Sequence, residues 1–318
     1  MRATVGLIAN PAAGRDIRRL TARASLVPNH EKAAVVRRVL HGLAATGVDG
    51  VRYLADRAGI VAAAVDGSAP PLATEPLPYR ARGSASDSTE AARLLAAEGV
   101  GALVVLGGDG TSRAVAAACG ELPLVAISTG TNNVFPSMVD GTVAGMAAGL
   151  VATGAVDVDR VSTRVKRIEV LAGGTTDVAL IDAAACLDVF VGTRAIWDPG
   201  RVRELVLTRA APWSVGLSSI GGQLRPLGVD EPAGLHVQLG AGREILAAIA
   251  PGVVALVPVA GWRLLPLGEP VVLAGARTVA LDGERELTVD GEVTARVTRA
   301  GPRLVDIHAA LEEAVANG

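Results

Sequence analysis

Five consecutive residues, Gly107-Gly108-Asp109-Gly110-Thr111, have the types and spacing to act on a phosphate group. They follow an apolar run at 102–106 that is typical of a buried strand, and they precede a segment at 112–119 that is typical of a helix. The glycines allow close backbone approach, and a helix start offers unpaired N–H groups and the positive end of the helix dipole. A carboxylate repels phosphate, so Asp109 indicates a further task, either taking a proton from a hydroxyl or holding a magnesium ion. A tight turn without a ligand is the alternative interpretation.

Two other loops of small and polar residues also follow predicted strands. The strand at 4–9 ends in Asn10-Pro11-Ala12-Ala13-Gly14, and the strand at 122–127 continues into the loop 128–136. Parallel sheets bind ligands beyond the carboxyl ends of their strands, so we expect the GGDGT turn and the loop 129–136 to face one cleft. Turn chemistry alone is the alternative for Asn132-Asn133, since Asn tolerates left-handed backbone conformations.

The elements that must position these loops alternate between strand and helix in the first half. Helical spacing covers 31–45 and 142–153, and Asp87 with Glu90 resembles a capping box that starts a helix before Ala91. The proline-rich stretch 70–78 is interpreted as a surface excursion. Repeated strand–helix units predict an α/β domain with a parallel sheet and flanking helices.

The second half has the pattern of a mostly antiparallel β domain. A hairpin is predicted over 167–181 and a half-buried strand over 293–298. The uncharged run 245–262 is interrupted by Pro251, Gly252 and Pro258, which favours buried strands over a membrane helix. We therefore expect an α/β domain at 1–155, a β-rich domain at 156–305 and a terminal helix at 306–318.

Bulk composition excludes several classes of function. The net charge of −2 provides no electrostatic footprint for nucleic acid. The four histidines and two cysteines show no ligand spacing, so no metal-ligating residues are expected. Lys32 and Lys166 are the only lysines; we attribute this to the codon usage of a GC-rich genome and infer no function from it. The N-terminus shows no secretory pattern, so we expect a cytoplasmic protein without stable membrane insertion. We also expect a homo-oligomer.

The order of four motifs resembles a known superfamily. These are NPxxG at 10–14, GGDGT at 107–111, GTxNxF at 130–135 and DGE at 282–284. Together they resemble the NAD kinases, diacylglycerol kinases and sphingosine kinases, and most of all the ATP-NAD kinase-like proteins of the acetoin-catabolism X type. The resemblance implies a two-domain, NAD kinase-like fold whose cleft transfers the γ-phosphoryl of ATP, with Mg²⁺, to a hydroxyl. Such transfer needs mainly positioning, charge neutralisation and a group that orients the hydroxyl.

The resemblance also implies roles for individual residues. Asp109, as in NAD kinases, or Glu284, as in the lipid kinases, would be the catalytic base. The residues expected to hold the nucleotide and its phosphates are Asn10, Gly107, Gly108, Gly110, Thr111, Gly130, Thr131, Asn132 and Asn133. Those expected to contact the acceptor are Asp182, Ser218 and Ser219, the serines because 217–222 loosely resembles an LSAGG segment; a flexible turn is the alternative there.

Two departures from the family patterns bear on the acceptor. Val134 replaces the Asp that follows Asn in the lipid kinases, and Ile181 occupies the position of an Asn with which NAD kinases hold NAD. The expected function is an ATP-dependent kinase acting on NAD or a related small molecule, which would serve NADP biosynthesis. The alternatives are a lipid or small-alcohol kinase and a non-catalytic nucleotide-binding sensor, and the donor could be ATP or polyphosphate.

Overall fold

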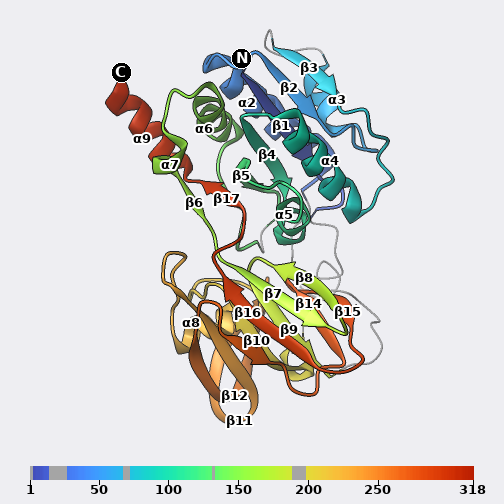
Figure 1. The fold of residues 1–318 in the computed structure, drawn as a ribbon, viewed down its shortest axis with the longest axis vertical. Coiled ribbons are helices and arrows are strands. Elements are labelled where there is room, and N and C mark those ends of the chain that lie inside the picture. Colours follow the sequence, from blue (N-terminus) through green and yellow to red (C-terminus); the bar gives the residue numbers. More distant parts are fainter. Residues whose placement is uncertain (1–2, 14–26, 67–71, 131–132, 188–197) are drawn as a thin grey trace.

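A computed structural model describes residues 3–13, 27–66, 72–130, 133–187 and 198–318. The chain forms two lobes, an α/β lobe and a β-sheet lobe, which Figure 1 shows one above the other. This arrangement confirms the fold class expected from the sequence.

The first lobe is built on a seven-stranded sheet of order β3-β2-β1-β4-β5-β17-β6. All neighbouring strands are parallel except β17 and β6, which are antiparallel. Its strands are β1 (Thr4–Ala9), β2 (Gly50–Tyr53), β3 (Ala73–Pro76), β4 (Ala102–Gly107), β5 (Pro123–Ser128), β6 (Ser162–Arg164) and β17 (Arg303–Val305).

Helices cover both faces of this sheet because its central strands are apolar on both sides. One core contains Leu7, Val104 and Val125, and helices α2 (Asn29–Ala45), α3 (Ile60–Val65), α6 (Gly141–Thr153) and α9 (Ile307–Asn317) pack on it. The opposite core contains Ile8 and Val105, against which α4 (Ala85–Glu98) and α5 (Asp109–Ala116) pack. A short helix, α7 (Val158–Val161), leads into β6.

The second lobe packs two antiparallel sheets face to face. The larger has the order β12-β11-β10-β9-β14-β15 and the smaller the order β13-β16-β7-β8, with an apolar core between them. A short helix, α8, covers the other face of the larger sheet. Their bounds are β7 (Arg167–Ala172), β8 (Thr175–Ala179), β9 (Asp182–Cys186), β10 (Val202–Leu207), β11 (Ala233–Ala250), β12 (Val253–Pro266), β13 (Pro270–Val272), β14 (Thr278–Leu281), β15 (Glu284–Thr288), β16 (Val293–Thr298), α8 (Ser218–Leu224) and a 3₁₀ turn at Pro199–Arg201.

The boundary between the lobes differs from the one expected at residues 155 and 156. Strands β6 and β17 belong to the first sheet, and Ile307 and Ala310 of α9 lie in a core of the first lobe. The chain therefore enters the second lobe after β6 and returns to the first with β17. Strands of three residues carry too little periodicity to reveal this return from the sequence.

Three local expectations also change. Residues 73–76 form β3, an edge strand paired with β2, where a surface excursion was expected. The capping box of α4 is made by Ser84 and Asp87, not by Asp87 and Glu90. The run 245–262 lies in the hairpin β11–β12 as expected, but Leu246, Val254 and Leu256 are exposed rather than buried.

Among the described residues, no helix is both long and apolar enough to cross a bilayer.

Candidate functional site

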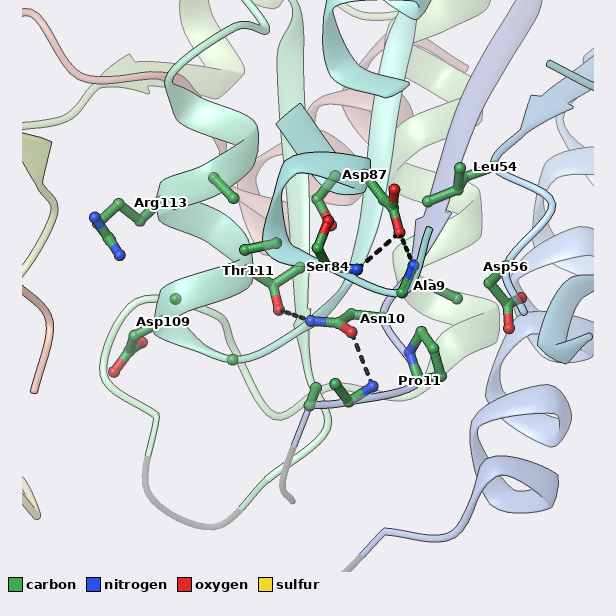
Figure 2. A pocket seen from close by; sticks show the side chains of 18 of the residues that line it. Ala9, Asn10, Pro11, Leu54, Asp56, Ser84, Asp87, Asp109, Thr111 and Arg113 are labelled. Atoms are coloured by element: carbon green, nitrogen blue, oxygen red, sulfur yellow. Dashed lines mark hydrogen bonds between the residues drawn. The ribbon is translucent and has the colours of Figure 1, made fainter. Parts of the chain in front are cut away.

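A cavity of about 330 Å³ lies at the junction of the two lobes, and we call it the junction cavity. Its volume is in the range of small-molecule sites in proteins. Figure 2 shows its first-lobe wall, where β1, α4 and α5 bring side chains together. The motif residues on its wall are Asn10, Gly108, Asp109, Gly110, Thr111, Asn133, Asp282 and Glu284.

The NPxxG turn is held in place from two sides. The side-chain amide of Asn10 donates to the Thr111 hydroxyl at 2.8 Å, and its carbonyl oxygen accepts from the Ala12 N–H at 2.8 Å (Figure 2). Behind the turn, the fully buried ammonium of Lys32 donates to the backbone carbonyls of Asn10, Pro11 and Ala13 at 2.9–3.1 Å. Lys32 thus fixes the backbone conformation that presents Asn10 to the cavity.

The glycines of GGDGT allow two close approaches. A Cβ on Gly107 would lie 2.4 Å from the Thr111 side chain, and one on Gly108 would lie 2.7 Å from the amide oxygen of Asn133. Any side chain at either position would displace the turn or the loop 133–136. The helix α5 begins immediately after Gly108, so its first N–H groups, which lack partners within the helix, lie at the cavity wall.

Asp109 holds the neighbouring loop. Its carboxylate accepts hydrogen bonds from the Val134 N–H at 3.0 and 3.1 Å and from the Phe135 N–H at 2.8 Å. The GGDGT turn and the loop after β5 therefore face one cleft, which confirms that prediction. Since an ionised carboxylate accepts but does not donate, a proton on Asp109 would weaken these contacts.

The DGE turn is anchored by a reciprocal pair of acids. Asp282, at φ 51°, accepts from the N–H groups of Leu180 and Ile181 at 2.7–3.1 Å, and Asp182 accepts from the Gly283 N–H at 3.1 Å. Burial, and after it the negative charge of Asp109, raise the pKa of Asp282 to about 7. The Ile181 hydrogen bond and the Arg113 charge act in the opposite direction. Asp182 is thus a support of the DGE turn and does not line the cavity.

Arg113 connects the lobes beside this turn. It lies one helical turn after Asp109 on α5, with its Nε 3.9 Å from Asp282 and an Nη 3.6 Å from Asp177. Its side chain is largely shielded from solvent and lines the junction cavity. Figure 2 shows Arg113 and Asp109 on the same side of α5, pointing away from Asn10.

Asp87 shapes the opposite rim. Its carboxylate accepts from the Tyr79 hydroxyl and from the N–H groups of Arg82, Gly83 and Ser84 at 2.6–3.1 Å. Burial alone would raise the pKa of Asp87, but the hydrogen bonds outweigh it and hold the pKa below its usual value. Asp87 therefore folds the chain segment before α4 over the cavity.

Other expected site residues lie elsewhere. Thr131 and Asn132 fall outside the described residues. Gly130 does not line the junction cavity; it lies against Asn133, whose side-chain nitrogen would be 3.1 Å from a Cβ there, and its carbonyl accepts from the Ser128 hydroxyl at 2.8 Å. Ser218 and Ser219 are buried in α8, where the Ser219 hydroxyl donates to Gly216 and Ala248 carbonyls. Neither serine lines the junction cavity, because α8 packs its first turn onto the hairpin of the second lobe.

Sequence reasoning missed three cationic residues: Lys32, behind the NPxxG turn of the first lobe, and Arg113 and Arg209, which lie where the lobes meet. The rarity of lysine could have revealed Lys32, because the chain replaces lysine by arginine nearly everywhere else. The helical spacing from Asp109 could have revealed Arg113. No sequence signal distinguishes Arg209, whose side chain contacts Phe135 and Val134 only through the tertiary fold.

Comparison with known proteins agrees with the division of the chain into two lobes. Residues 5–155 match the ATP-NAD kinase N-terminal domain, and residues 166–300 match the acetoin catabolism protein X C-terminal domain. Acetoin catabolism protein X of Cupriavidus necator H16 is 39% identical over 284 residues, covering 84% of this chain and 79% of that protein. The chain belongs to the acetoin catabolism protein X family.

Two solved structures from Bacillus anthracis str. Sterne, each provisionally described as a diacylglycerol kinase, are similar in shape. The first has a TM-score of 0.45 and 14% identity, with 95% of this chain and 96% of that chain covered. The second has a TM-score of 0.43 and 13% identity, with 95% and 98% covered.

Proposed function

We propose that this protein is an ATP-dependent phosphotransferase that acts on a hydroxyl group of NAD or a related small molecule. The observation that carries the proposal is the junction cavity, where three separate motifs, around Asn10, Asp109 and Glu284, line one space. Phosphoryl transfer needs such a convergence of backbone donors, charged groups and a proton acceptor.

The excess of negative charge on the cavity wall fits a polyphosphate that binds as its complex with a metal cation. Five carboxylates line the cavity (Asp56, Asp87, Asp109, Asp282 and Glu284), against two arginines, Arg57 and Arg113. No three His, Cys, Asp or Glu side chains of the described residues gather into a metal site. Mg²⁺ in kinases is typically held by one or two carboxylates together with the phosphates, and it neutralises their charge. Asp109, on the cavity wall at the start of α5, is the acid that would hold it together with the phosphates.

The two expected bases have different surroundings, and these favour Glu284 as the proton acceptor. The oxygens of Asp109 accept from the Val134 and Phe135 N–H groups, and a proton would weaken these contacts, so its main task is to position the loop. Glu284, the last residue of the anchored DGE motif, begins β15, is half-buried and lines the cavity. A partly desolvated carboxylate beside the cavity is suited to accept the hydroxyl proton.

The test is turnover of labelled ATP with Mg²⁺ against NAD, NADH, small alcohols including acetoin, and lipids. Transfer of label to one acceptor, lost in Glu284→Gln, is the expected result. Exposed Glu312, on α9, provides a matched control, because Glu312→Gln should leave transfer unchanged. Binding of a non-hydrolysable ATP analogue without labelling of any acceptor would contradict the proposal and support a non-catalytic sensor.

A further inference from the structure

A second cavity, of about 590 Å³, adjoins the junction cavity, and Asn133 lines both. We call it the Arg209 cavity. Its wall comes from the loop after β5, the segment between β10 and α8, and the segment between α8 and β11. A molecule bound here would lie next to Asn133 and the loop that Asp109 holds.

The walls of the Arg209 cavity are fixed by hydrogen bonds. Ala210 and Leu227 pair through both of their backbone N–H groups, at 3.0 and 2.8 Å, which joins the two second-lobe segments. The buried ammonium of Lys166 donates to the carbonyls of Gly228, Glu231 and Ala233 at 2.8–2.9 Å. Binding here would therefore cost little ordering of the protein.

The charge of this cavity is opposite to that of the junction cavity. Arg209 is the one charged side chain among the described residues that line it, and no carboxylate lines it. The guanidinium lies 5.4 Å from the centre of the Phe135 ring and donates to the Val134 carbonyl at 3.3 Å. The negative charges of Asp109 and Asp282 act on Arg209 from the junction cavity. A guanidinium has five N–H donors, however, and the Val134 contact uses one of them, so Arg209 can also donate to an anion.

Apart from Asn133 and Ser214, the rest of the wall is apolar and ends in an exposed indole. Val134, Val215 and Leu227 contribute aliphatic surface, and Trp213 is 84% exposed at the edge of the cavity. An exposed indole beside a preformed cavity offers a face on which a planar or apolar group can stack.

We propose that the Arg209 cavity binds the phosphoryl acceptor, and that this acceptor is an anion carrying a planar or apolar group next to its hydroxyl. The carboxylate or phosphate of the acceptor pairs with Arg209, and the planar or apolar group lies on Trp213. Neutral small alcohols lack the first contact and bind weakly. This assignment rests on the proposed phosphotransferase function, because the acceptor must reach a donor in the junction cavity.

Calorimetric titration of the full chain with two matched pairs of probes tests the assignment. The first pair is 3-phenyllactate and its neutral counterpart 3-phenylpropane-1,2-diol; the second is nicotinamide mononucleotide and nicotinamide riboside. We expect the anion of a pair to bind about 10- to 100-fold more tightly than its partner, the scale of a hydrogen bond to a charged group. A preference in the first pair identifies the acceptor as a hydroxy acid, and a preference in the second identifies it as a nucleotide.

Variants assign the preference to its residues. Arg209→Gln should abolish it, Arg209→Lys should keep part of it, and Trp213→Ala should weaken both members of a pair about 2- to 10-fold. Arg263→Gln and Trp262→Phe, in the hairpin of the second lobe, are the matched controls and should change nothing. If Arg209→Gln does not fold, Arg209→Lys and Trp213→Ala decide.

A non-hydrolysable ATP analogue titrated into the same samples separates the two proposals. Equal affinity for the anion and for its partner without the anionic group, or no binding of any probe while the analogue binds, overturns the acceptor site but not the phosphotransferase. Anion binding without any binding of the analogue overturns the phosphotransferase and leaves the anion site standing.

Discussion

Replacing Asp109 by Asn distinguishes a carboxylate that positions a loop from one that moves a proton. The carboxylate receives the N–H groups of Val134 and Phe135 at 2.8–3.1 Å. With its amide oxygen in the place of Oδ1, an Asn can keep the contacts with Val134 and Phe135, but its NH₂ group then replaces Oδ2 and faces the Val134 N–H, donor against donor. The substitution therefore loosens the loop after β5 as well as removing a charge.

The size of the effect follows from the lost contact. A hydrogen bond to a charged group contributes about 1.5–3 kcal/mol, and because Asp109 is only half-buried we expect a loss of about 1–2 kcal/mol in the free energy of unfolding. For a chain of 318 residues that corresponds to a Tm lower by roughly 1.5–3 °C. Misplacing the loop that flanks the cavity should lower kcat by about 10²-fold.

Thermal unfolding and steady-state kinetics on the same preparation measure both effects. Asp66→Asn is a matched control, because Asp66 is exposed at the end of α3 and should change neither quantity. An Asp109→Asn variant with the Tm of the native protein and a kcat loss of about 10³–10⁴-fold would refute the positioning role and make Asp109 the proton acceptor.

Three further outcomes are expected. Glu284→Gln should lower kcat by about 10²–10⁴-fold without weakening the binding of an ATP analogue, and full activity would remove Glu284 from the mechanism. Lys32→Met leaves three carbonyls without their donor, so urea unfolding should show a loss of more than about 2 kcal/mol; Lys32→Arg should rescue little, because a planar guanidinium cannot replace the three donors of the ammonium. The folded state binds a proton on Asp282 more tightly than the unfolded state does, so between pH 3.8 and about 7 this group's contribution to the free energy of unfolding falls as the pH rises. The fall is at most ~1.4 kcal/mol per pH unit, and Asp282→Asn should abolish it; an unchanged pH profile of urea unfolding would contradict this.

Much of the fold could be predicted because buried parallel strands are continuous apolar runs. The runs at 102–106 and 122–127 identified β4 and β5, and the loops that follow them carry the motifs. The membership of β6 and β17 in the first sheet could not be predicted. Each strand has only three residues, too few to show a hydrophobic period, and the two strands pair with each other across more than 130 residues.

The site was predictable where its chemistry is local and not where it depends on tertiary contacts. The GGDGT and DGE turns are contiguous in the sequence, so they could be recognised. Lys32 contacts carbonyls that lie 19 to 22 residues earlier, and Arg209 contacts a residue 75 positions earlier. Both lysines nevertheless share one function, since each caps three carbonyls of a loop beside a cavity. Codon usage therefore does not explain why these two positions carry lysine: a guanidinium could not make the same contacts.

The position of Ile181 explains why the acceptor must be recognised elsewhere. Its N–H is bound by Asp282, and its buried side chain packs in a core that also contains residues of α4 and α5 from the first lobe. A polar amide at this point would be buried in an apolar core, at a cost of about 1–3 kcal/mol if left without a partner. The position is thus used to join the lobes and to anchor the DGE turn, not to contact a substrate. Under our proposal, selectivity for the acceptor would then fall to the Arg209 cavity, whose cationic and mostly apolar wall differs from the acidic wall of the junction cavity.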